Sequence, residues 1–399
     1  MPSSPIAAIE VGTSKVCVLV GDLLEDDQLM IVGQGVSPSR GVRKGQVTDL
    51  DNVTSCLNHA LEQAEEQADV TVSEAYVVIS GDHIQSMTNR GSVPVRSPGG
   101  LVAEEEVEDV GDLARAVALP TERAILHSIA QRYYLDDQHA VLRPEGMEAA
   151  RLTLDMLIIH CLRNRIKNVV RTLKEVNVEV ADIAFGGLMS GMAVLSPEQK
   201  QGGAIVIDLG GGTTDYLVYA NMAIAAAGSL SVGGDHVTND IALGLGLPHG
   251  QAEELKKNSG SAVVSPAAGS QTVALQPEGG FPGKNVRLSD IQTIINARME
   301  ETFELVRDSI LRSGLRTEMV SGVILTGGGA HLEGAVQLAS EIFNRECQIG
   351  RPRNVNGLAV VTEGPQYAAP LGMLQHAVRS RNRGRKSGIL GALINLIKG

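Results

Sequence analysis

One stretch of the sequence decides the expected fold: Asp208-Leu-Gly-Gly-Gly-Thr-Thr-Asp215. It follows the apolar run Ala204–Asp208 and precedes a second strand-like run, Tyr216–Tyr219. A glycine turn between two such runs predicts a strand–turn–strand unit whose backbone can approach a ligand closely. Consecutive N–H groups at a turn form a cradle for an anion, so this unit is a candidate phosphate site.

The same unit occurs at the start of the chain, about 200 residues earlier. There Ile6–Val11 and Lys15–Gly21 flank the turn Glu10-Val-Gly-Thr-Ser-Lys15. A third glycine turn, Thr326-Gly-Gly-Gly-Ala330, follows the apolar run 322–325 and is expected to lead into a helix from about His331. Repetition at this distance predicts two related halves, and the alternation of strands with helices predicts α/β layers.

The turns carry side chains suited to phosphate. Because the carboxylates of Asp208 and Asp215 would repel a phosphate, we expect Mg²⁺ between them and the ligand. Neither a Walker A loop nor a Rossmann glycine motif is present. A lone glycine turn is commonly a structural hairpin, so the prediction depends on the set of three. Hydroxyl donors and a compact positive charge accompany the turns at Thr13, Ser14, Lys15, Thr213 and Thr214.

Composition excludes several classes of protein. With 43% apolar and 20% charged residues among 399, the chain is expected to fold into more than one domain. The sequence contains no run of about 18 apolar residues, which is the length needed to span a bilayer. A net charge of −12, no tryptophan and 3% aromatic residues argue against nucleic-acid binding. The four cysteines are widely spaced, which predicts neither a zinc site nor disulfides and fits a reducing cytoplasm.

The end of the chain differs in charge from the rest. Residues 364–399 carry six basic and no acidic side chains, so the remainder carries −18. Arg379–Lys386 is mainly basic and lacks apolar periodicity, which predicts a flexible linker. At 100° per residue, six apolar side chains of Ser387–Gly399 share one side of a helix. This pattern predicts an amphipathic membrane anchor. The alternative is a helix docked on the protein core. These six are Ile389, Leu390, Leu393, Ile394, Leu396 and Ile397.

Taken in order, these motifs resemble the superfamily of actin, Hsp70 and the sugar kinases, and within it the FtsA family of bacterial cell-division proteins. Five segments carry the resemblance: EVGTSKV (10–16), PSRGVRKGQVTDL (38–50), YVVISGDHI (76–84), VIDLGGGTTD (206–215) and GVILTGGGAHLEG (322–334). The resemblance implies an actin-like α/β fold of two lobes around a nucleotide cleft, with a subdomain inserted in the first lobe. It also implies a C-terminal amphipathic helix.

The resemblance divides the chain into these parts. The first lobe would comprise 1–88, 167–200 and 355–378, with the inserted subdomain at 89–166. The second lobe would comprise 201–235 and 301–354, with its own insertion at 236–300. The basic linker would be 379–386 and the membrane helix 387–399.

The resemblance also implies the ligands, which are ATP and Mg²⁺. Glu10 and Asp208 would hold the metal through water, and Asp208 would position the metal or the attacking water. Glu253 and Lys256 would lie along the adenosine. Without the resemblance, two opposite charges three residues apart on a helix would be interpreted as a surface ion pair. The implied nucleotide-binding residues are Glu10, Gly12, Thr13, Ser14, Lys15, Asp208, Gly210, Gly211, Gly212, Thr213, Thr214, Gly233, Gly234, Glu253, Lys256, Gly327, Gly328 and Gly329.

One departure from the superfamily pattern concerns activity. Hydrolytic relatives place Glu or Gln where this chain has Ile183-Ala-Phe-Gly-Gly-Leu188, which contains neither. Because phosphoryl transfer to water depends on such a residue, we expect ATP binding with weak or absent hydrolysis. A second departure is Glu10, where many members of the superfamily have Asp.

The implied partners are the C-terminal peptide of the tubulin-like protein FtsZ, further copies of the chain in filaments, other division proteins and the membrane. Arg287 and Arg298 would bind the peptide, unless they only pair with Asp290, Glu300 or Glu301. The expected location is the cytoplasmic side of the inner membrane at midcell. Two alternatives remain open: a pilus-assembly adaptor of the PilM type, and an active phosphotransferase such as a sugar kinase. A chaperone of the Hsp70 type is disfavoured, because no region long enough for a β-sandwich follows residue 378.

Overall fold

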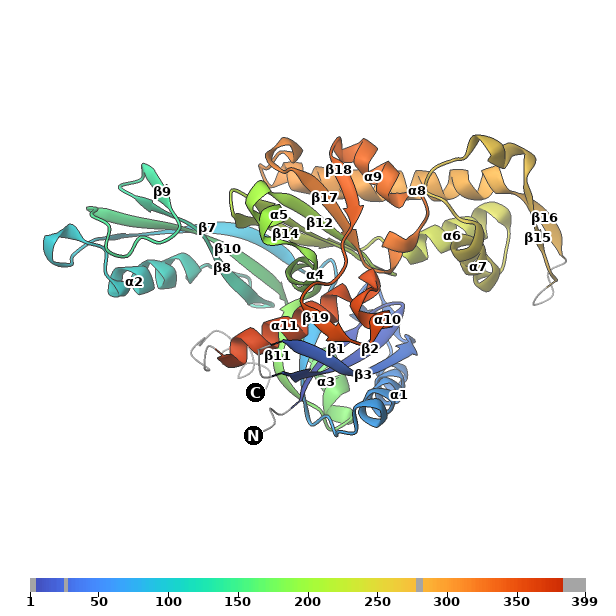
Figure 1. The fold of residues 1–399 in the computed structure, drawn as a ribbon, viewed down its shortest axis with the longest axis horizontal. Helices are drawn as coiled ribbons and strands as arrows, with labels where there is room; N and C mark the ends of the chain where they lie inside the picture. The colour runs from blue at the N-terminus through green and yellow to red at the C-terminus, as the bar shows by residue number, and fades with distance from the viewer. Residues whose placement is uncertain (1–4, 25–27, 278–282, 383–399) are drawn as a thin grey trace.

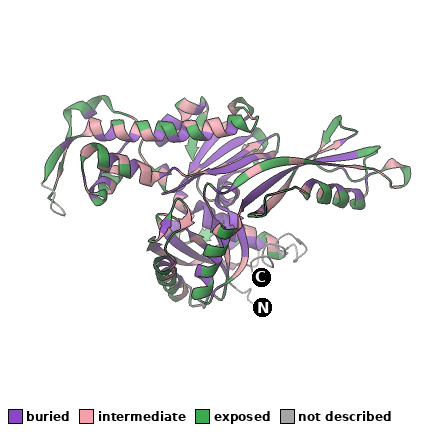
Figure 2. Cartoon of the chain, turned by 180° about the vertical axis from the view of Figure 1, so that it is seen from behind, coloured by how far each residue is buried: buried purple, intermediate pink, exposed green. Residues whose placement is uncertain are grey.

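The computed structural model describes residues 5–24, 28–277 and 283–382. Two α/β lobes lie one above the other, and each lobe extends sideways through an insertion (Figure 1). One insertion contains β7 to β10, and the other contains α6, α7, β15 and β16. In each lobe the inner strands are the buried elements, and exposed residues gather on the outer helices and on the insertions (Figure 2).

The first lobe is built on a six-stranded sheet in the order β11-β6-β1-β2-β3-β19. β1 pairs antiparallel with β2 and parallel with β6. The short hairpin of β4 and β5 leads from β3 towards the first helix. The elements of this lobe are β1 (Ile6–Val11), β2 (Lys15–Leu23), β3 (Leu29–Pro38), β4 (Val42–Arg43), β5 (Gln46–Val47), α1 (Leu50–Ala68), β6 (Glu74–Ile79), α3 (Arg163–Glu175), β11 (Glu179–Phe185), α4 (Gly186–Val194), β19 (Val355–Gly357), α10 (Ala359–Thr362) and α11 (Ala368–Asn382). The short helix α5 (Pro197–Gly202) packs on the second lobe.

The second lobe repeats this pattern in a five-stranded sheet, β14-β13-β12-β17-β18. β12 pairs antiparallel with β13 and parallel with β17, as β1 does with β2 and β6. The prediction of two related α/β halves is therefore confirmed. The elements are β12 (Ala204–Leu209), β13 (Thr214–Ala220), β14 (Ala223–Leu230), β17 (Gly322–Thr326), α9 (Ala335–Phe343) and β18 (Glu346–Ile349).

Helix α1 shows why the first lobe packs closely. Asp49 caps its N-terminus by accepting a hydrogen bond from the backbone N–H of Asn52, a role that aspartate before a helix commonly has. The buried face of α1 lies on β3 at Gly33 and Gly35. A Cβ at Gly35 would overlap the carbonyl oxygen of Ala60, so only glycine lets the helix approach the strand this closely.

The insertion in the first lobe is a four-stranded sheet, β7-β10-β8-β9, covered by α2. It has its own small apolar core, which includes Val110, Leu152 and Leu154. The boundaries expected at 89 and 166 fall inside β7 and α3, so the folded unit extends from 85 to 162. Its elements are β7 (Gln85–Pro94), α2 (Glu104–Arg115), β8 (Arg123–Leu135), β9 (His139–Val141) and β10 (Arg151–Leu162).

The insertion in the second lobe consists of α6 (Gly234–Leu245), α7 (His249–Ser259), the hairpin of β15 (Thr272–Leu275) and β16 (Lys284–Arg287), and α8 (Leu288–Arg312). The apolar spacing of residues 288–312 predicts a helix, and α8 has these bounds. Since α8 is continuous through residue 300, the boundary expected there falls inside a helix. Phe303 of α8 packs edge-on against Phe343 of α9, with ring centroids 6.3 Å apart, which joins the insertion to the lobe core.

Two predictions near the end of the chain need correction. The helix expected from about His331 begins only at Ala335, because Gly334 adopts a left-handed conformation that interrupts the turn before it. Helix α11 continues to Asn382, so the first four residues of the expected linker 379–386 are helical. The predicted membrane helix at 387–399 lies outside the described residues. Among the helices that the structure describes, none is long and apolar enough to cross a membrane.

Candidate functional site

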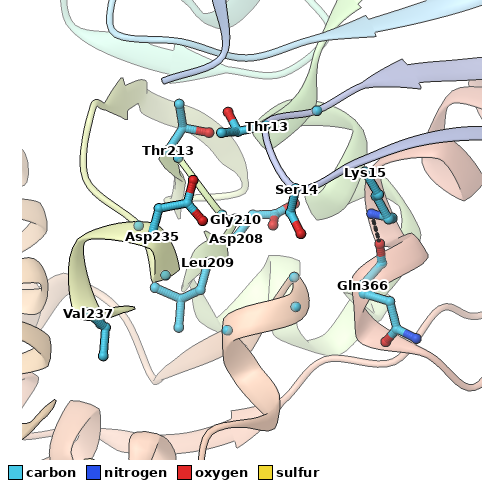
Figure 3. Close-up of a pocket in the computed structure, with 18 of the residues that line it drawn as sticks. Thr13, Ser14, Lys15, Asp208, Leu209, Gly210, Thr213, Asp235, Val237 and Gln366 are labelled. Carbon is cyan, nitrogen blue, oxygen red and sulfur yellow. Dashed lines mark hydrogen bonds between the residues drawn. The ribbon is translucent and has the colours of Figure 1, made fainter. Parts of the chain in front are cut away.

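A cavity of about 490 Å³ lies between the two lobes. The turn between β1 and β2 forms one wall and the turn between β12 and β13 faces it, while α6, α7, α8 and the third glycine turn close the remaining sides. Figure 3 shows side chains from both turns, including Thr13, Ser14 and Thr213, in this cavity. The structure thus brings together three segments that are up to about 315 residues apart in the sequence.

The two facing turns have the same backbone geometry. The N–H of Gly12 donates to the carbonyl of Lys15 at 3.0 Å, and the N–H of Gly210 donates to the carbonyl of Thr213 at 2.9 Å. The turns approach so closely that a Cβ at Gly212 would lie 2.5 Å from Thr13 Oγ1. Glycine is therefore required where the turns meet, and backbone N–H groups of such turns can bind an anion.

Two further glycine segments are fixed on the second turn. The N–H groups of Gly234 and Asp235 donate to the carbonyls of Gly210 and Gly211 at 3.0 and 2.8 Å. Gly327 adopts a left-handed conformation with φ +81°, and a Cβ there would overlap Asp208 Oδ1. The predicted residues Gly233, Gly234 and Gly327, Gly328, Gly329 therefore line the same cavity as Gly210 to Gly212.

Two buried carboxylates of the cavity have raised pKa values. Burial raises the pKa of Asp208 to about 6, although its carboxylate accepts a hydrogen bond from Ser190 Oγ. Burial, together with the charge of Asp208, raises the pKa of Asp215 to about 7. A neutral carboxyl is favoured in a low-dielectric site that holds several acids, and a bound cation would favour the charged form.

Asp215 accepts hydrogen bonds from both lobes, whereas its position in the motif suggested a cation shared with Asp208. Its two oxygens accept hydrogen bonds from Ser80 Oγ of the first lobe and Ser229 Oγ of the second, both at 2.5 Å. The carboxylate expected to share a cation with Asp208 therefore joins the lobes. Among the described residues, no group of three acidic, histidine or cysteine side chains is arranged to hold a metal ion. Glu10 and Asp208 both line the cavity, and two carboxylates suit Mg²⁺, which retains several waters.

Lys15 is also committed to protein partners. Its ammonium lies 3.0 Å from Glu10 Oε2, donates to the carbonyl of Gln366 at 2.9 Å and lies over the ring of Tyr367. Burial alone would lower the pKa of Lys15, but the Glu10 carboxylate raises it above the usual value. The lysine that the sequence assigns to phosphate therefore neutralises Glu10 and ties the first turn to the segment that precedes α11 (Figure 3).

Glu253 and Lys256 lie in the cavity and are not a purely solvated pair. Their charged groups are 2.6 Å apart, and Lys256 also donates to Thr238 Oγ1 at 2.8 Å and to the carbonyl of Gly234 at 3.1 Å. Burial of Glu253 acts against its charge, but the bonds from Lys256 and Thr238 lower its pKa to about 2. The pair thus fixes α7 against the turn at residues 233–234.

The predicted partner-binding arginines lie on and before α8, outside the residues that line the cavity. Arg287 Nε is 3.0 Å from Asp290 Oδ2, and Arg298 Nε is 2.5 Å from Asp240 Oδ2. Arg298 also pairs with Glu301. Both arginines therefore have acidic partners, as the alternative interpretation expected.

Several lining residues could not be identified from the sequence. Gly45 and Ser80 reach the cavity from turns of the first lobe, Gln366 from the short 3-10 helix Pro365–Tyr367, and Met299 and Thr302 from α8. Gly45 and Ser80 fall within the segments 38–50 and 76–84 that carry the resemblance, although no binding role was assigned to either. Gln366, Met299 and Thr302 lie outside those segments.

The repeated sheets and the cleft between them define an actin-like protein. Among solved structures, a PilM–PilN type IV pilus biogenesis complex superposes with a TM-score of 0.65 at 16% identity, covering 94% of this chain and 99% of the other. MreB5 of Spiroplasma citri bound to ADP gives 0.56 at 14% identity, covering 96% and 99%. These likenesses show the fold alone.

Sequence comparison identifies the family. A family model described as cell division protein FtsA matches residues 205–372, and one described as the SHS2 domain inserted in FtsA matches residues 81–160. Cell division protein FtsA of Pseudomonas aeruginosa is 34% identical over 387 residues, which is 97% of this chain and 92% of that protein. The chain belongs to the FtsA family of cell-division proteins, as the resemblance predicted.

Proposed function

We propose that this chain is an ATP-binding, actin-like cell-division protein that polymerises on the membrane and tethers the FtsZ ring to it. The observation that carries the proposal is the pair of matching glycine turns facing each other across one cavity, in a chain of the FtsA family. We place its action on the cytoplasmic side of the inner membrane at midcell, where it would recruit further division proteins.

The cavity suits a nucleoside triphosphate with Mg²⁺. Backbone N–H groups of the two turns, with the hydroxyls of Thr13, Ser14 and Thr213, would bind the phosphates. Glu10 and Asp208 would hold the metal through water, and the metal would neutralise charge between them and the phosphates. Glu253, Lys256 and the third glycine turn would bind the adenosine.

We expect turnover of ATP to be slow. β11 ends at Phe185 and α4 begins at Gly186, so the backbone beside Asp215 carries no Glu or Gln side chain that could orient water. Release of phosphate from ATP by purified protein should stay below about 1 s⁻¹, which is slow for an enzyme. Faster turnover that is lost in Asp208→Asn would contradict this expectation. It would show that a residue outside 183–188 positions the attacking water.

We propose that the FtsZ peptide binds near α8. The charge reversal Arg298→Glu should weaken peptide binding, measured by fluorescence anisotropy, because it removes a cation and repels acidic groups. Arg307→Glu is the matched control, since Arg307 lies on the same helix and also pairs with acidic neighbours, Glu304 and Asp308. Unchanged affinity in Arg298→Glu would remove this residue from the peptide site.

The same variant needs a second comparison, because Arg298 is paired with Asp240. Glutamate at 298 would repel Asp240 and could disturb α6, whereas Arg298→Gln removes the charge without adding repulsion. If the glutamine variant loses part of the affinity and keeps its melting temperature, the effect is on the peptide. If peptide affinity falls only together with the melting temperature, Arg298 stabilises the insertion and does not bind the peptide.

We propose that the C-terminal segment anchors the protein and that filaments strengthen the anchor by linking many weak sites. Purified protein should sediment with anionic vesicles, and ATP should increase the sedimented fraction if nucleotide favours assembly. Equal sedimentation with and without lipid would contradict the membrane part of the proposal.

A further inference from the structure

The inserted subdomain contacts both lobes. Its strands β7, β8 and β10 run inwards to the junction between the lobes and lie against β14, the edge strand of the second sheet (Figure 1). At this inner end, Leu126, Leu157 and Ile159 belong to the apolar core built around the first-lobe sheet. The N–H of Phe185, at the end of β11, also donates to His127 Nε2 of β8 at 3.0 Å. The subdomain is therefore fixed in the first lobe and reaches across to the second.

Side chains of the subdomain make the polar contacts with the second lobe. Ser86 Oγ of β7 donates to the carbonyl of Ala227 at 2.5 Å and accepts the N–H of the same residue at 3.2 Å. Gln131 Nε2 of β8 donates to the carbonyl of Ile224 at 2.8 Å, and Arg132 donates to a carbonyl of the turn before β14 at 3.0 Å. Because β14 and the strands of the subdomain belong to separate sheets, these contacts can separate without breaking either sheet.

The same strand, β14, also contacts the cavity. Ser229, two residues beyond Ala227, donates to Asp215 Oδ1 at 2.5 Å and accepts the N–H of Gly81 at 3.2 Å. The other oxygen of Asp215 accepts a hydrogen bond from Ser80, and both Asp215 and Ser80 line the cavity. β14 therefore joins the second lobe to the first at two places, beside the cavity and at the inserted subdomain.

These contacts favour one arrangement of the lobes. The facing turns are in close contact at Gly212 and Thr13, so separation of the lobes would widen the path by which a ligand leaves the cavity. A ligand whose phosphates bind the turn of each lobe would favour the same arrangement as the contacts on β14. Two interactions that stabilise one arrangement of a protein against another strengthen each other, and this coupling is reciprocal.

We propose that the inserted subdomain acts as a strap across the two lobes, and that its contacts through Ser86 and Gln131 slow the release of nucleotide from the cavity. This inference rests on the proposed function, because it requires a nucleotide in the cavity. Neither residue is among the described residues that line the cavity, so both are positioning residues that act by holding the lobes together. Bound nucleotide should in turn hold β14 more firmly on the subdomain.

The test is the rate at which the full chain releases a fluorescent analogue, N-methylanthraniloyl-ATP bound with Mg²⁺, when unlabelled ATP is added in excess. In Ser86→Ala/Gln131→Ala the rate constant should rise about fivefold, equivalent to about 1 kcal/mol, which is the order of one neutral hydrogen bond. Ser92→Ala/Gln138→Ala is the matched control and should release the analogue as wild type does. Ser92 bonds to Thr153 within the subdomain, and Gln138 is exposed on the turn after β8.

Hydrogen exchange measures the strap itself. The N–H of Ala227, which donates to Ser86 Oγ, should exchange with solvent faster in Ser86→Ala/Gln131→Ala than in wild type. ATP should slow this exchange in wild type, and should slow it less in the variant. An unchanged exchange rate at Ala227 in the variant would show that the two side chains do not hold β14.

The release rates separate the inference from its alternatives. If Ala227 exchanges faster in Ser86→Ala/Gln131→Ala while the analogue leaves at the wild-type rate, the strap does not hold the site and the inference is wrong. If the control variant releases the analogue equally fast, the effect comes from a loosened subdomain and not from the contacts with β14. If folded wild-type protein binds no analogue, the proposed function itself fails, and the inference fails with it.

Discussion

Gly211→Val should abolish the stabilisation of this protein by ATP. A Cβ at Gly211 would lie 2.8 Å from Ser14 Cβ and 3.3 Å from the backbone nitrogen of Ser14, in the space where the two turns face each other. A ligand that binds only the folded state stabilises it by about 2.7 kcal/mol at a hundredfold excess over its dissociation constant. Wild-type protein should therefore melt at a higher temperature with ATP and Mg²⁺, and the variant should show no shift.

A second glycine separates this effect from a general loss of stability. Gly111 lies on α2 of the inserted subdomain, and a Cβ there would meet nothing within 4 Å. Gly111→Val should keep the full upward shift with ATP. If folded wild-type protein shows no shift at millimolar ATP, or if Gly211→Val shifts as much as wild type, the assignment of the cavity to nucleotide is contradicted.

Leu393→Glu should release the protein from lipid vesicles. Leu393 lies at the centre of the six apolar residues that share one side of the predicted helix 387–399. Each such side chain contributes ~1.5–3 kcal/mol when fully buried, and less at a membrane surface. A segment of 13 residues is too short for a stable helix in water, so its order should depend on the lipid. A charge at Leu393 should therefore remove most of the sedimented fraction while leaving ATP binding intact.

Asn395→Glu is the matched control, because it adds the same charge on the opposite side of the predicted helix. It should retain most of the membrane binding that Leu393→Glu loses. Truncation after Lys386 should give a folded, ATP-binding protein that stays in the supernatant. If the truncated chain unfolds, or still sediments with lipid, the segment packs on the protein core and does not anchor it.

The architecture could be predicted where local signals are strong. The helix at 288–312 and the cap of α1 at Asp49 follow directly from apolar periodicity and capping chemistry. The glycine turns at 210–212 and 327–329 identified the site, because a backbone that closely approaches another segment or a ligand leaves no space for a side chain. Their common cavity follows from the repeated strand order of the two lobes.

Other features depend on contacts between distant segments. β7 reads as polar because only Gly91 along it is buried, and it pairs with β10, more than 50 residues later in the chain. The serines that engage Asp215 come from residues 80 and 229, and the partner of Lys15 beyond Glu10 comes from residue 366. Residue types alone indicated a cation for Asp215 and a phosphate for Lys15, and they gave no sign of these protein partners. Both residues line the cavity, so their part in ligand binding stays a prediction.

The tether itself is tested most directly by sedimenting FtsZ filaments with anionic vesicles in the presence and absence of this protein. With wild-type protein and ATP, FtsZ should move from the supernatant to the vesicle fraction, and Leu393→Glu should return it to the supernatant. FtsZ lacking its C-terminal peptide should not be recruited. If this protein sediments with the vesicles while intact FtsZ remains in the supernatant, the claim that it links the FtsZ ring to the membrane is contradicted.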